Sequence, residues 1–164
     1  MDKTQCFLEI FDSYGQEEYA ALTREYMTRY PSFMYIFSVT NVLDEQRKKY
    51  TIEKLEELIK YRDGQRNFPI IFAINKVDVP ESKRATQVEE IKQFIFQLIG
   101  KYNFTNTEIF EISAKVRINI EEIFSCVIRR GSWSQFDAVA ALKMIIEKDT
   151  QVLEISKKKK CTIQ

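Results

Sequence analysis

The chain has 164 residues, 45% of them hydrophobic, and its 25 basic and 24 acidic side chains leave a formal net charge of +1. This length suits one domain, and the balanced charge excludes a general electrostatic attraction to nucleic acid. The sequence has no histidine and only three scattered cysteines, which excludes Ser-His, Cys-His and His-metal chemistry, a disulfide framework and a zinc site. No apolar run reaches the roughly 18 residues of a membrane span and no signal peptide is evident, so we expect a protein of the reducing cytosol.

Short apolar runs rich in branched and aromatic side chains predict strands. In chain order these runs are residues 6–11, 33–39, 69–74 and 108–112. Between and after them, apolar residues at the helical period predict helices over residues 16–30, 45–61, 87–102 and from Asn119 onward. Strands that alternate with helices of crossover length predict an α/β fold, with a mostly parallel sheet and flanking helices.

Polar residues follow three of the predicted strands. They are Asp12-Ser13-Tyr14-Gly15-Gln16 after the first, Asn75-Lys76-Val77-Asp78 after the third, and Ser113-Ala114-Lys115 after the fourth. Each group alone is also typical of a turn or a helix cap. Because ligands of open parallel sheets bind outside the carboxyl ends of the strands, the three groups together favour a nucleotide site.

The chemistry of the last two groups fits guanine. The carboxylate of Asp78 can accept hydrogen bonds from both the ring N–H and the amino group of that base. The alkyl stem of Lys76 can lie against the ring, and backbone N–H groups around Ala114 can meet the exocyclic carbonyl. The amide of Asn75 can tie the neighbouring loops together. Adenine presents the wrong donors and acceptors to Asp78, so the site would discriminate between the bases.

These motifs, with the stretch CFLEIFDSYGQEEY from Cys6, resemble the Ras superfamily of small GTPases over residues 6–130. The resemblance implies a P-loop NTPase-type sheet and a membrane-anchored signalling switch that binds GTP, GDP and Mg²⁺. It also implies effector and regulator proteins as partners. By the same resemblance Asp12 holds Mg²⁺ through water, the Gly15 N–H contacts the γ-phosphate and Gln16 orients the attacking water.

The sequence departs from the family pattern near its start. It contains no G-x-x-x-x-G-K-[ST], no strand before such a loop and no first switch, so we expect an incomplete G domain that binds phosphates weakly. An N-terminally truncated relative is favoured over a short protein with a repacked sheet. Tyr14 stands where the family has alanine, which leaves hydrolysis by Gln16 open. The alternative is a nucleotide-independent pseudo-GTPase or a membrane-tethered interaction module.

The C-terminal part predicts two further regions. Residues 131–155 hold an extra helix that Ser134 would cap, and residues 156–164 form a polybasic tail. The tail ends in Cys161-Thr162-Ile163-Gln164, a C-a-a-X pattern that predicts farnesylation of Cys161, next to four lysines. A lipid and a basic cluster together predict attachment to the cytoplasmic face of the plasma membrane. The alternative is a solvated lysine end with an incidental cysteine.

Overall fold

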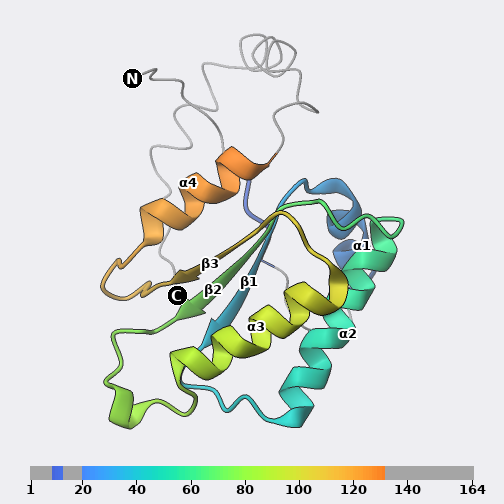
Figure 1. Cartoon of the computed structure of the whole chain (residues 1–164). Coiled ribbons are helices and arrows are strands. Elements are labelled where there is room, and N and C mark those ends of the chain that lie inside the picture. Colours follow the sequence, from blue (N-terminus) through green and yellow to red (C-terminus); the bar gives the residue numbers. More distant parts are fainter. Residues whose placement is uncertain (1–8, 13–19, 132–164) are drawn as a thin grey trace, which may run out of the picture.

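The computed structural model describes residues 9–12 and 20–131 (Figure 1). Over these residues the chain forms an open parallel sheet with flanking helices, which confirms the predicted α/β class. The elements in chain order are α1 (Ala20–Arg29), β1 (Phe33–Ser38), α2 (Glu45–Tyr61), β2 (Ile70–Asn75), a 3-10 turn (Glu81–Lys83), α3 (Val88–Tyr102), β3 (Thr107–Glu111) and α4 (Ile120–Arg130).

The described residues form three strands of this sheet, in the order β1-β2-β3. β1 pairs with β2 in parallel from Phe33 opposite Ile70 to Ser38 opposite Asn75, and β3 pairs with the other edge of β2. The first five residues of β2 are buried, since this strand has neighbours on both edges and helices on both faces. A continuous apolar run is the pattern expected of such a strand.

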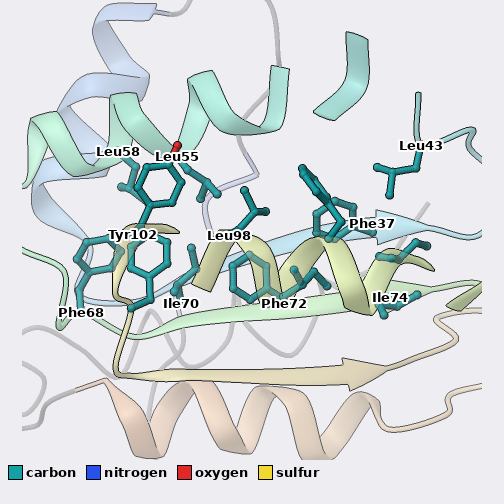
Figure 2. Close-up of a cluster of buried hydrophobic side chains, with 14 of the residues drawn as sticks. Phe37, Leu43, Leu55, Leu58, Phe68, Ile70, Phe72, Ile74, Leu98 and Tyr102 are labelled. Atoms are coloured by element: carbon teal, nitrogen blue, oxygen red, sulfur yellow. The ribbon is translucent and has the colours of Figure 1, made fainter. Parts of the chain in front are cut away.

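Two apolar clusters hold the helices to the sheet. On one face, side chains of β1 and β2 meet Leu55 and Leu58 of α2 and Leu98 and Tyr102 of α3 (Figure 2). On the other face, Ile71 and Ala73 of β2 pack with α4, whose buried residues are Ile123 and Cys126. The alternation along β2 therefore divides the core into two layers.

Local signals set the ends of the two longest helices. The side chain of Asp44 accepts a hydrogen bond from the backbone N–H of Arg47 at 2.8 Å and caps the start of α2. Asn103 ends α3 in the left-handed conformation, with φ of 53°, a common way to stop a helix. Among the described residues, no helix is both long and apolar enough to cross a membrane.

The predicted strand over residues 6–11 is wrong for its described part. Glu9 to Asp12 belong to no strand, and Ile10 is 64% exposed. Phe11 instead stacks on Tyr26 of α1, with the ring centroids 3.6 Å apart. A strand needs a paired neighbour, and among the described strands β1 pairs only with β2. Residues 6–8 and the predicted start of the first helix at Gln16 lie outside the described residues.

Candidate guanine-nucleotide site

The loops after β2 and β3 lie side by side at the carboxyl ends of their strands. This follows from the parallel pairing of the two strands. Backbone hydrogen bonds between the two segments continue beyond the last residue of β3. The N–H of Ile112 donates to the carbonyl of Ile74 at 2.8 Å, and the N–H of Val77 donates to the carbonyl of Ile112 at 3.2 Å. The structure thus brings together the two motifs that sequence reasoning assigned to one base.

Asn75 ties the two loops. Its side-chain Oδ1 accepts from the N–H of Lys76 at 2.7 Å and from the N–H of Ala114 at 3.2 Å. One amide oxygen therefore holds a residue of each loop. The N–H of Ala114 is engaged by this bond, so a ligand carbonyl at the loop would be met by neighbouring N–H groups.

Ser113 orients the acidic residue of the site. Its side chain is fully buried, and its Oγ donates to Oδ1 of Asp78 at 2.5 Å while accepting from the N–H of Val116 at 3.2 Å. A carboxylate has two oxygens, and this bond engages one of them. Asp78 is half-buried, so the carboxylate is held in one orientation with access to a ligand.

Lys76 lies at the open side of the same site. Its backbone has a φ of 67°, in the left-handed region that non-glycine residues rarely adopt. Its exposed side chain extends to the loop after β1, where Nζ donates to Oγ1 of Thr40 at 3.0 Å. A strained backbone of this kind persists only where the surroundings hold it, and the bond to Asn75 does so here.

Arg84 braces the loop that carries the acidic residue. Its Nε donates to the carbonyl of Val79, and its Nη2 donates to the carbonyl of Val77, each at 2.9 Å. These carbonyls flank Asp78 in the chain, and the Arg84 side chain is only 13% exposed. The guanidinium therefore sets the path of the loop on both sides of the carboxylate.

A nearby ion pair anchors α3 to the end of β3. Nζ of Lys92 lies 2.5 Å from a carboxylate oxygen of Glu111, the last residue of β3. This hydrogen bond raises the pKa of the Lys92 ammonium, and burial partly opposes the shift. The pair keeps α3 aligned with the strand that leads into the Ser113 loop.

Comparison with known proteins matches residues 1–132 to the Ras family. The chain belongs to the Ras family of small GTPases. The mouse Ras-related protein Ral-B is 28% identical over 160 residues, which cover 98% of this chain and 68% of that protein. Over the same shares of both chains, rat Ral-B is 28% identical and the Ras-related protein O-RAL of Diplobatis ommata is 27% identical. Members of this family bind guanine nucleotide and Mg²⁺ and act with effector and regulator proteins.

The structure does not place Asp12 with the base motifs of this Ras-family site. Asp12 is exposed and follows Phe11, whose ring stacks near Tyr26 and Tyr30 close to the amino end of β1. The assignment of Asp12 to Mg²⁺ therefore stays a prediction from the family resemblance. Gly15, Gln16 and Cys161 lie outside the described residues.

The described residues fit the base better than the phosphates. Carboxylate, amide and backbone groups converge at Asp78, Asn75 and the Ser113 loop, as a purine edge requires. Within the described part of the chain, by contrast, no three acidic, cysteine or histidine side chains are grouped as a metal site.

Sequence reasoning missed Thr40 and Arg84. Thr40 comes just after a predicted strand, and its place at a carboxyl end was an available signal. Arg84 lies in a polar loop where no local pattern singles it out. Its role depends on how the loop folds back onto its own carbonyls.

Proposed function

We propose that the protein to which this chain belongs is a guanine-nucleotide switch that binds GTP and GDP and hydrolyses GTP at a membrane. The observation that supports this most is the pair of bonds from Ser113 to Asp78 and from Ala114 to Asn75. Together they orient a carboxylate and join two loops at the carboxyl edge of a parallel sheet.

In this proposal each group of the site has one task. The carboxylate of Asp78 accepts from the ring N–H and amino group of guanine, and Ser113 keeps it oriented. The stem of Lys76 covers one face of the ring, and Lys115 stands in the loop whose N–H groups meet the carbonyl. Mg²⁺, when bound, neutralises phosphate charge. Hydrolysis is assigned to Gln16, and effector binding to the segment around Gly15.

The test is titration of the purified chain with a fluorescent GDP, with ATP as competitor, beside an Asp78→Asn variant. Asn replaces one acceptor by a donor. The variant should therefore lose affinity for guanine nucleotides and gain affinity for xanthine nucleotides, whose base has a carbonyl in place of the amino group. Guanine-selective binding with this exchange supports the proposal. Binding that ATP displaces as well as GTP does would contradict it.

A nucleotide-independent interaction module is the second candidate. It is favoured by the Glu9–Asp12 segment, which stays out of the sheet and whose Phe11 ring stacks on Tyr26. If this candidate is right, the chain binds no guanine nucleotide even at millimolar concentration, although a cooperative unfolding transition shows that it is folded. The same titration therefore separates the two functions.

Membrane attachment is the remaining part of the proposal. The C-a-a-X pattern at Cys161 and the lysines before it support a farnesylated protein at the cytoplasmic face of the plasma membrane. Expression with a farnesyl donor should add one lipid mass, and Cys161→Ser should abolish both the added mass and binding to anionic vesicles. Unchanged vesicle binding by the variant would refute lipid anchoring.

A further inference from the structure

Thr40 stands next to the base site without belonging to either motif. It follows β1 by two residues, and the end of β1 lies beside the end of β2, since Ser38 pairs with Asn75. The loops after the two strands are therefore neighbours, and Oγ1 of Thr40 accepts from Lys76 Nζ at 3.0 Å. The side chains come from segments 36 residues apart in the chain, so the contact depends on the sheet.

The Thr40 hydroxyl is itself held in place. Its Oγ1 lies 2.9 Å from Oγ of Ser38, and Oγ of Ser38 also lies 3.4 Å from the Thr40 N–H. The two hydroxyls share one hydrogen bond, in which either oxygen can donate. The result is a series of hydrogen bonds that links the lysine ammonium to the end of β1.

We propose that Thr40 is a positioning residue that holds the Lys76 side chain over the plane where guanine binds. This inference rests on the proposed function. A lysine side chain has four rotatable carbons and loses much rotamer freedom when it packs on a ligand. A bond that orders the side chain before binding removes part of that loss, and the nucleotide then binds more tightly.

The opposing view is that Thr40 only stabilises the turn after β1. That view predicts an effect of Thr40 that does not depend on Lys76. A double-mutant cycle separates the two, because a positioning effect disappears when the positioned side chain is removed. Thr40→Val removes the hydroxyl at nearly constant shape, Thr40→Ser retains it, and Lys76→Met removes the ammonium.

The first measurement is GDP affinity. We expect Thr40→Val to weaken GDP binding about fivefold, the size of one modest hydrogen bond, and Thr40→Ser to stay within about twofold of the parent. Thr105→Val, an exposed threonine in the loop before β3, is the matched control and should leave affinity unchanged. In the Lys76→Met background, Thr40→Val should have no further effect. An equal loss in both backgrounds would overturn the proposal.

The second measurement needs no nucleotide. The side-chain ammonium of Lys76, identified by its loss in Lys76→Met, should be more mobile by NMR relaxation in Thr40→Val than in the parent. Equal mobility would overturn the proposal whatever the affinities. If the parent chain binds no GDP at all, the proposed function fails, and the NMR comparison alone decides whether Thr40 holds Lys76.

Discussion

The two ends of the sheet are built in opposite ways. At the carboxyl end, the loops after β2 and β3 are joined by side-chain hydrogen bonds, include the left-handed Lys76 and leave polar groups accessible. At the amino end, Phe33 and Phe68 pack edge to face with centroids 5.4 Å apart, and the guanidinium of Arg62 lies 5.3 Å from the Phe68 ring.

Arg62 shows what the amino end does. Its guanidinium donates to the carbonyls of Thr28 and Tyr30, each at 3.2 Å, and so provides donors for carbonyl groups at the end of α1. The same guanidinium lies over the rings of Phe33 and Phe68. Burial lowers the pKa of this guanidinium, which nevertheless stays charged at neutral pH. The amino end thus stabilises the fold, whereas the carboxyl end holds groups in orientations that a ligand could use. Substitutions at the two ends should separate stability from binding.

The largest effect should come from Phe68→Ala at the amino end. Phe68 is 3% exposed and contacts Phe33, Phe104 and Arg62, so its loss leaves a cavity and should cost about 3–5 kcal/mol of unfolding free energy. Urea denaturation measures this value. Phe96→Ala is the control, since Phe96 is 60% exposed and should change stability by less than about 0.5 kcal/mol. Equal losses of stability in both variants would contradict the assignment of a stabilising role to the amino end of the sheet.

Asn75→Ala should have the next largest effect, at the carboxyl end. It leaves the N–H groups of Lys76 and Ala114 without their acceptor, at a cost of about 1–3 kcal/mol. It should also weaken guanine binding more than it weakens the fold, because it releases the two loops from each other. Asn75→Asp keeps an acceptor oxygen and should recover most of the stability in the same urea titration. Failure to recover would show that the tie is not the reason for the loss.

Arg84→Met should have a smaller effect on stability, about 1–2 kcal/mol, because two carbonyls beside Asp78 lose a charged donor but gain access to water. We expect a shift of the Asp78 and Val79 amide signals in NMR spectra. Lys83→Met, an exposed neighbour, is the control and should leave those signals in place. Unmoved signals in Arg84→Met would remove Arg84 from the description of the site.

The smallest effect concerns pH and the pair of Lys92 with Glu111. The folded pKa of Lys92 is raised, so the pair's stabilisation is fully present below the ordinary lysine pKa of about 10.4 and is lost as pH rises through the raised value. Both side chains are partly exposed, which limits the contribution to under about 1 kcal/mol. Lys92→Met should flatten this alkaline loss in unfolding curves between neutral pH and pH 11. An unchanged alkaline slope would contradict the assignment.

Much of the fold follows from local pattern. The apolar run at residues 69–74 predicted the strand β2, and the helical period predicted α2 and α3 to within a residue of their observed bounds. The neighbouring positions of the Asn75 and Ser113 motifs were also predictable, since parallel strands end at one edge. By contrast, the run at residues 6–11 has strand composition, but Glu9 to Phe11 do not join the sheet.

The sequence by itself determined the α/β class, the bounds of α2 and α3, and which polar residues meet at the carboxyl edge. These properties depend on side-chain chemistry at short spacing, which the sequence contains directly. Only the tertiary structure decided that Phe11 stacks on Tyr26, that Arg84 braces its own loop and that Thr40 receives Lys76. A strand pairing or a long-range hydrogen bond forms only when a second segment lies beside the first. The packing of the whole domain decides which segment that is.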